Sequence, residues 1–223
     1  MNITLQGKTA LVIGGLSPIN QALCAALVEA GAKVWHQVFE KKEIETSTSS
    51  KAIITDVRQP NNIRELAEYI INKDKKIDIL IHSFPVPQAR TLHDMNAQEW
   101  LELFEYCVDV PFLSCQNIIP HMVKNNGGII INISSSAAVT GEGAPHFAAA
   151  NSTLQSMTRG LAREYKEKNV RVSGVAPSFL TKDEKENKQI ISSTVAMTLL
   201  LCSEYGGHMS GESILVDGGK SVG

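Results

Sequence analysis

Seven short runs of apolar, mostly β-branched residues alternate with longer amphipathic segments, and this alternation constrains the fold more than any other feature. The runs occupy residues 9–13, 33–38, 52–55, 77–81, 129–133, 170–175 and 213–216. Because apolar and polar residues do not alternate within them, the runs are typical of strands buried on both faces, as in parallel sheets between two helical layers. Right-handed crossovers then set the winding. The sequence therefore predicts an α/β fold, a Rossmann-like doubly wound parallel sheet of about seven strands with helices on both faces.

The segments between the strands predict helices separated by a few polar stretches. The expected helices cover residues 19–30, 61–72, 98–124 and 146–168. Pro111 should kink the third of them, because proline removes a backbone hydrogen bond. Residues 40–50, with a Thr/Ser run, predict a solvated loop, and residues 181–188 predict a charged surface segment. No repeat or linker interrupts the pattern, so residues 1–223 should form a single domain.

Composition limits the partners of such a domain. The chain has 21 Lys+Arg and 23 Asp+Glu, a formal net charge of -2, which supplies no broad attraction to nucleic acid or to an anionic membrane. It shows no signal-peptide pattern and no apolar run that could span a bilayer, so we expect a cytoplasmic protein. The four cysteines lie in apolar helical patterns and should be reduced core residues. The six histidines show no metal-ligand spacing, so no metal is expected.

The order of segments resembles the short-chain dehydrogenase/reductase (SDR) superfamily over nearly the whole chain. The stretches that carry the resemblance are GKTALVIGG, DVRQP, IDIL, PHMVKNNGGIIINISS, RVSGVAPSF and SGESILVDGG. The resemblance implies a small-molecule ligand in a cleft beyond the carboxyl ends of the strands, near Gly14, His82, Ser135 and Pro177.

The turn after the first strand departs from the family's pattern T-G-x-x-x-G-x-G. Gly14 keeps the first glycine, with Gly15 beside it, but Pro18 and Asn20 stand at the second and third glycines. Proline there removes an N–H donor where the backbone would approach a pyrophosphate. Ser17 and Pro18 also form an ordinary helix start, as an N-cap and a first helical residue.

The remaining nucleotide signals are sparse. The second strand ends in HQVFE, with neither the family's ribose-binding aspartate nor an arginine for a 2′-phosphate. Glu40 lies close to the position of that aspartate but beyond it in the sequence. Asp56 and Val57 match the adenine-side pattern, although Asp before a turn is also ordinary. We therefore expect no cofactor. Retained NAD(P) binding is the alternative, and the residues that would then serve are Gly14, Gly15, Ser17, Ile19, Asp56 and Val57.

The resemblance places different side chains at the family's catalytic positions. In the family, lysine lowers the pKa of a tyrosine from about 10 so that the phenol can exchange a proton. Phe147 stands at the tyrosine position, Asn151 at the lysine position and Cys107 at the position of the relay asparagine. Ser135, flanked by Ser134 and Ser136, matches the substrate-orienting serine, a residue type that equally caps turns.

The pair His82 and Ser83 carries one further resemblance, to the divergent enoyl-reductase branch of the family. That branch's tyrosine would fall near Ala144 and its lysine at Asn151. This resemblance therefore supplies neither a catalytic tyrosine nor a catalytic lysine.

Three functions remain open on these residues. The favoured expectation is a redox-inactive binding, scaffold or regulatory subunit that has lost NAD(P)-dependent hydride transfer. By resemblance it would be a homo-oligomer (dimer or tetramer), or a hetero-oligomer with an active SDR, pairing through helices 98–124 and 146–168. The second is a cofactor-independent lyase, isomerase, dehydratase or cyclase that uses His146 or His82 as a general acid/base near Ser135. The third is an atypical NAD(P)-dependent oxidoreductase with substituted proton donors.

Overall fold

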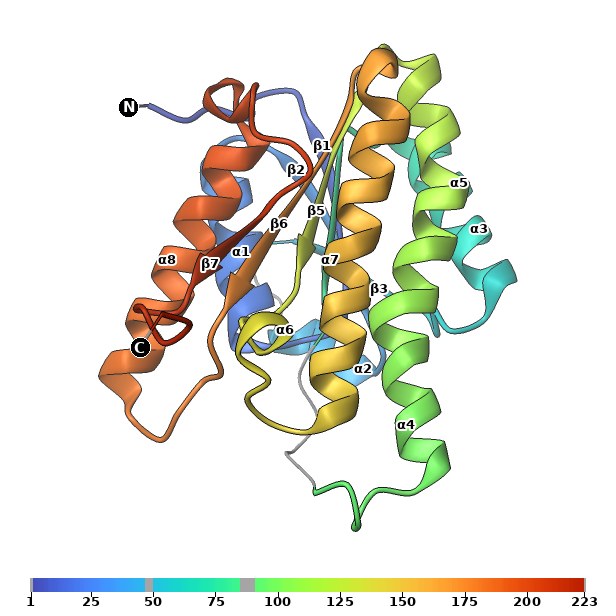
Figure 1. The fold of residues 1–223 in the computed structure, drawn as a ribbon. Coiled ribbons are helices and arrows are strands. Elements are labelled where there is room, and N and C mark those ends of the chain that lie inside the picture. The colour runs from blue at the N-terminus through green and yellow to red at the C-terminus, as the bar shows by residue number, and fades with distance from the viewer. Residues whose placement is uncertain (1, 47–49, 85–90, 223) are drawn as a thin grey trace.

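A seven-stranded parallel sheet forms the middle layer of the structure, a computed structural model that describes residues 2–46, 50–84 and 91–222 (Figure 1). Its strands are β1 (Thr9–Ile13), β2 (Lys33–Val38), β3 (Lys51–Ile54), β4 (Ile79–Ser83), β5 (Gly128–Ile133), β6 (Val170–Pro177) and β7 (Ser213–Val216). Their order is β3-β2-β1-β4-β5-β6-β7, and every neighbouring pair is parallel. The predicted doubly wound Rossmann-like fold is confirmed.

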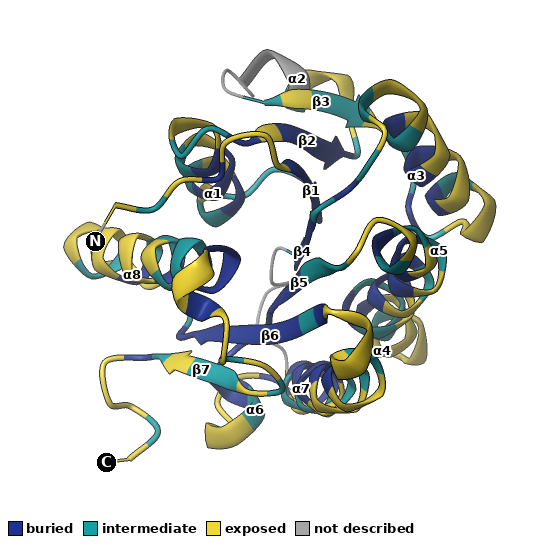
Figure 2. Cartoon of the chain, turned by 90° about the horizontal axis from the view of Figure 1, so that it is seen from above, coloured by how far each residue is buried: buried dark blue, intermediate teal, exposed yellow. Residues whose placement is uncertain are grey.

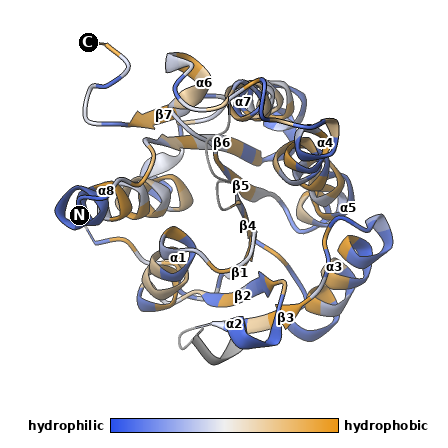
Figure 3. Cartoon of the chain, turned by 90° about the horizontal axis from the view of Figure 1, so that it is seen from below, coloured by the Kyte–Doolittle hydropathy of each residue, from blue (hydrophilic) through white to orange (hydrophobic). Residues whose placement is uncertain are grey.

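Helices cover both faces of this sheet, with their buried sides turned toward it (Figure 2). Helices α1 (Pro18–Glu29) and α8 (Glu184–Cys202) lie on one face. The opposite face carries α3 (Pro60–Asp74), α4 (Ala97–Phe104), α5 (Val110–Lys124) and α7 (Pro145–Tyr165), and the same two layers appear from below in Figure 3. Short 3₁₀ turns occupy Lys166–Lys168 and Glu204–Gly206. Within the described residues, no helix is both long and apolar enough to cross a membrane.

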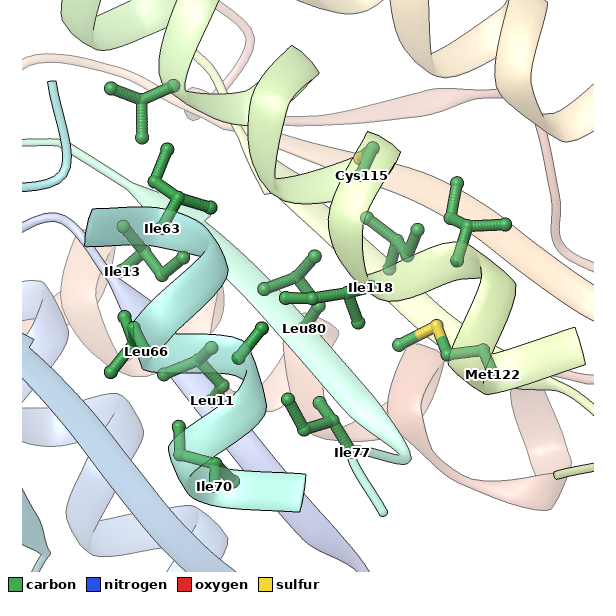
Figure 4. Close-up of a cluster of buried hydrophobic side chains, with 14 of the residues drawn as sticks. Leu11, Ile13, Ile63, Leu66, Ile70, Ile77, Leu80, Cys115, Ile118 and Met122 are labelled. Carbon is green, nitrogen blue, oxygen red and sulfur yellow. The ribbon is translucent and has the colours of Figure 1, made fainter. Parts of the chain in front are cut away.

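The central strands contribute side chains to two separate cores. On the α3/α5 face, Leu11 and Ile13 of β1 and Leu80 of β4 join residues such as Ile63 and Met122 (Figure 4). The alternate residues of the same strands pack on the α1/α8 face, among them Ala10, Val12, Ile79 and Ile81. This burial of both faces is what the unbroken apolar runs predicted. The four cysteines are buried and free of disulfide bonds, also as predicted.

The winding of the sheet reverses between β1 and β4, which are neighbours although β2 and β3 separate them in sequence. The backbones after β1 and at the end of β4 pack closely against each other at this point. Gly14, directly after β1, has a φ of 139°, and a Cβ there would lie 1.9 Å from the carbonyl oxygen of Ser83 at the end of β4. The side-chain amide of Asn20 donates to the carbonyls of Gly15 and Ser83, both at 2.8 Å, and so ties the turn to β4.

Two polar stretches are more regular than predicted. The expected loop at 40–50 contains α2 (Lys41–Thr46), while residues 47–49 lie outside the described part of the chain. Glu43 stabilises the start of α2 by accepting the backbone N–H of Glu40 at 2.9 Å. The charged segment at 181–188 is partly the first turn of α8, which Asp183 caps by accepting the backbone N–H groups of Lys185 and Glu186.

The long helix expected at 98–124 is divided where Pro111 was predicted to kink it. A π-helical segment, Glu105–Asp109, separates α4 from α5, and Pro111 lies in the first turn of α5. Proline cannot donate to the preceding turn, so the hydrogen-bond ladder is rearranged at this point. A short helix that the sequence did not predict, α6 (Ala137–Thr140), follows β5.

The close contact at the switch point gives a direct test of the fold. Gly14→Ala should lower the free energy of unfolding by about 3 kcal/mol or more, because the new methyl group would overlap the Ser83 carbonyl. Gly160→Ala is the matched control, because that glycine is exposed in α7 and a Cβ there meets no atom within 4 Å. The control should gain roughly 0.5–1 kcal/mol from helix propensity. Urea unfolding of both variants measures the difference, and a Gly14→Ala protein as stable as wild type would contradict this view of the turn.

Candidate active site

The turn after β1 is held by acceptors from the chain itself. The backbone N–H of Gly14 donates to Gln37 Oε1 at 3.0 Å, and that of Gly15 donates to the Gln37 carbonyl at 3.2 Å. The backbone N–H of Leu16 donates to Glu43 Oε1 at 2.9 Å. Three successive amides that face the cleft in a dinucleotide fold are therefore already engaged.

The start of α1 has the predicted form. Ser17 is the N-cap, its hydroxyl accepts the backbone N–H of Asn20 at 3.1 Å, and Pro18 is the first helical residue. Ile19 follows it in the first turn, where amides have no partner inside the helix. This helix end therefore remains the most anion-favouring part of the turn.

The adenine-side residues are also engaged. Asp56 accepts Nε and Nη2 of Arg58 in a two-point ion pair, each contact 2.8 Å long. This guanidinium holds the pKa of Asp56 below its ordinary value, although partial burial opposes the shift. Arg58 also lies over the Tyr106 ring, 5.5 Å from its centroid, and Val57 is fully buried in the core. A nucleotide would have to compete with Arg58 for the Asp56 carboxylate.

The three serines after β5 are buried. The Ser135 hydroxyl accepts the backbone N–H of Ala137 at 3.2 Å and donates a long hydrogen bond to the Pro177 carbonyl at 3.4 Å. Ser134 accepts from the side chain of Gln155, and the Ser136 hydroxyl is buried without a partner among the described residues. Ser135 therefore stabilises the turn into α6, and its weak bond to Pro177 could be exchanged for one to a ligand.

The positions that the resemblance assigns to tyrosine and lysine lie on the first two turns of α7. The Phe147 ring packs 5.0 Å from the ring of Phe179, in an apolar cluster that includes Cys107. Asn151 is buried and donates to the Phe147 carbonyl at 2.9 Å. These side chains offer no proton donor where the family has its tyrosine.

The candidate histidines point to different parts of the structure. His82 Nδ1 is 2.8 Å from Asn132 Oδ1 in the interior, and Asn132 donates in turn to Thr158. Burial lowers the pKa of His82 to about 4, although the Asn132 hydrogen bond opposes the shift. His146 packs against the Trp100 ring at 6.4 Å between centroids. Burial lowers its pKa too, and Glu99 partly offsets this effect.

The candidate catalytic residues are thus near one end of the sheet but are not assembled into one hydrogen-bonded group. Among the contacts of the described residues, none joins His82 or His146 to Ser135. Nor do three or more His, Cys, Asp or Glu side chains gather in a metal-binding arrangement within that part of the chain.

Sequence reasoning missed the residues that hold the glycine turn. Gln37 and Glu43 supply its acceptors, and the Asn20 amide bridges it to β4. The only local signal for Glu43 was an acid three residues after Glu40, the spacing of a capping box.

Comparison with known proteins identifies the family. A model of the short chain dehydrogenase family matches residues 8–190. The chain belongs to this short-chain dehydrogenase family. It is 26% identical to a 3-oxoacyl-acyl-carrier-protein reductase of Chlamydia pneumoniae and 28% identical to one of Aquifex aeolicus, and each alignment covers 98% of this chain and 99% of the relative. The structure of L-sorbose reductase from Gluconobacter frateurii, complexed with NADPH and L-sorbose, matches over 100% of both chains with a TM-score of 0.90. At 19% identity, that likeness shows the fold alone.

These relatives contradict the favoured expectation of a redox-inactive scaffold or regulatory subunit. Reductases align with this member of the short-chain dehydrogenase family over nearly its full length, which points to NAD(P)-dependent reduction instead. The expectation was based on the replacement of individual side chains, which removes particular proton donors but leaves the fold that this chain shares with the reductases.

The buried histidine gives a test of the site's interior. His82 has a pKa of about 4 when folded and 6.5 ordinarily, so the unfolded chain takes up a proton first as the pH falls. Its contribution to stability is therefore complete above pH 6.5 and declines between pH 6.5 and about 4, by up to about 3 kcal/mol.

Replacement of this histidine should remove that part of the pH dependence. We expect His82→Asn to flatten the stability profile measured by urea unfolding between pH 7 and 5. The exposed-site control His93→Asn should leave the profile as in wild type. Parallel profiles for wild type and His82→Asn would show that His82 is not buried as described.

Proposed function

We propose that this chain is an NAD(P)-dependent reductase of a keto substrate, of which a 3-oxoacyl thioester is the first class to test. The observation that carries the proposal is the alignment with 3-oxoacyl-acyl-carrier-protein reductases over 98% of the chain. Phe147 and Asn151 make it an atypical member, because neither can act as the family's proton donor pair. We retain the small-molecule cleft and a homo-oligomeric, cytoplasmic protein as parts of the same proposal.

The turn after β1 has features that favour a dinucleotide and one contact that competes with it. The first turn of α1, including the Ile19 amide, favours a pyrophosphate beyond β1. Gly14, without a side chain, allows the turn to lie at the switch point where such ligands bind. Glu43, however, already accepts the Leu16 amide, so its carboxylate must move when a nucleotide binds. Bound in this cleft, the nicotinamide supplies a hydride to the substrate carbonyl.

The chain must then hold and protonate the oxygen of the reduced carbonyl. Ser135 is suited to orient that oxygen, because its 3.4 Å hydrogen bond to Pro177 is weak enough to exchange. We assign proton donation to His146, which precedes Phe147 in the first turn of α7 and whose buried Nδ1 has no hydrogen-bond partner among the described residues. His82 is less suited, because Asn132 holds its ring in the interior. Since burial lowers the pKa of His146, reduction should become faster as the pH falls below neutrality.

Nucleotide oxidation in the presence of an acetoacetyl thioester tests the proposal. The wild-type protein should consume NADH or NADPH, and Ser135→Ala should lower kcat about 10²–10³-fold by removing a hydrogen bond to the reacting oxygen. Ser156→Ala is the control, because that serine is exposed in α7 and its hydroxyl accepts a hydrogen bond from the neighbouring Arg159.

The two parts of the proposal fail separately. Oxidation of neither nucleotide with any keto substrate would refute the reductase function. A Ser135→Ala enzyme as fast as wild type would refute only the role of Ser135.

A further inference from the structure

His146, the proposed proton donor, lies where two helices meet. It belongs to the first turn of α7, and α4 packs against α7 (Figure 1). The residue is only 4% exposed, and its Nδ1 has no hydrogen-bond partner among the described residues. The orientation of the imidazole therefore depends on the side chains that pack against it.

The ring that packs against the imidazole is Trp100 of α4. The two ring centroids are 6.4 Å apart and the planes are inclined by 29°, the arrangement of an offset stack. Trp100 also stacks on Phe104, one helical turn later in α4, at 5.1 Å and 19°. A series of ring contacts therefore joins α4 to the start of α7.

Helix α4 is fixed without help from the indole. Its start is a capping box in which Asn96 Oδ1 accepts the Glu99 amide and Glu99 Oε2 accepts the Asn96 amide, each at 3.0 Å. Leu103 anchors the other side of the helix in the apolar cluster that contains Phe147. Trp100, by contrast, is 38% exposed. Its ring can therefore be replaced without opening the core.

The surroundings of His146 oppose and favour its protonated form at once. Burial lowers the pKa of His146, and the negative charge of Glu99 on α4 partly offsets this effect. The first two turns of α7, residues 145–152, contain no other ionisable side chain. The face of an aromatic ring attracts a cation, so Trp100 also favours the imidazolium over the neutral ring. The imidazolium is the form that can donate a proton.

We propose that Trp100 is a positioning residue for His146, an inference that rests on the proposed reductase function. By stacking on the imidazole, Trp100 holds the proton donor at the start of α7 and favours its protonated form. This role requires no contact between Trp100 and the substrate or the nucleotide. Proton donation therefore depends on α4 as well as on α7.

NMR titration of the histidine rings tests the contact in the free protein, without nucleotide. His146→Gln assigns the signal of His146. In Trp100→Leu the midpoint of that signal should move to lower pH, because the side chain stays apolar but loses its aromatic face. Trp100→Phe keeps such a face and should titrate like wild type. Leu101→Ala is the control, because Leu101 is the next residue of α4 and is 60% exposed.

Steady-state kinetics with an acetoacetyl thioester test whether the contact serves the reaction. At neutral pH Trp100→Leu should lower kcat about threefold, the size expected for loss of one cation–π contact, and leave KM unchanged. The difference should narrow as the pH falls, because His146 then becomes protonated in both proteins. In a His146→Gln background Trp100→Leu should have no further effect, since the residue acts through the histidine.

The outcomes separate this inference from the function on which it rests. The role of Trp100 is wrong, and the reductase proposal stands, if Trp100→Leu leaves the His146 titration unchanged. The same holds if Trp100→Leu lowers kcat equally at every pH or does so again in the His146→Gln background. If wild type oxidises neither NADH nor NADPH with any keto substrate, the reductase proposal fails and the inference fails with it.

Discussion

Burial of the central strands on both faces is the constraint from which the rest of the structure follows. β1 and β4 send alternate side chains into two separate cores, so each needs a helical layer on either side. Short right-handed crossovers can satisfy both layers only by winding outward in two directions from these strands. That reversal presses Gly14 against the backbone of Ser83 and leaves the cleft at the carboxyl ends of the same two strands.

The sequence predicted the parts of the fold that depend on local apolar patterns. The strands at Thr9–Ile13, Lys33–Val38 and Ser213–Val216 have the predicted bounds, because an unbroken β-branched run identifies a buried strand by itself. Helix α2 was missed because its start depends on hydrogen bonds to Glu43 rather than on an apolar stripe. The first turn of α8 was missed for a similar reason, since Asp183 caps a segment too charged to show periodicity.

The candidate site was predictable in place but not in chemistry. Motif order placed Ser135 after β5, Phe147 on the next long helix and the glycine turn after β1, where the structure has them, and the Ser17 cap followed from local rules. The contact between Leu16 and Glu43 joins residues 27 positions apart and depends on how α2 meets the turn, so no local pattern reveals it. The inference of lost redox function failed because it counted missing side chains, whereas the relatives align over 98% of the chain.

The central claim is that a nicotinamide dinucleotide binds across the ends of β1 and β4, and a crystal structure with NADH tests it most directly. We predict a pyrophosphate at the start of α1, with Glu43 displaced from the Leu16 amide. A saturated crystal in which the cleft holds no nucleotide, or in which NADH binds elsewhere while Glu43 stays on Leu16, would contradict it.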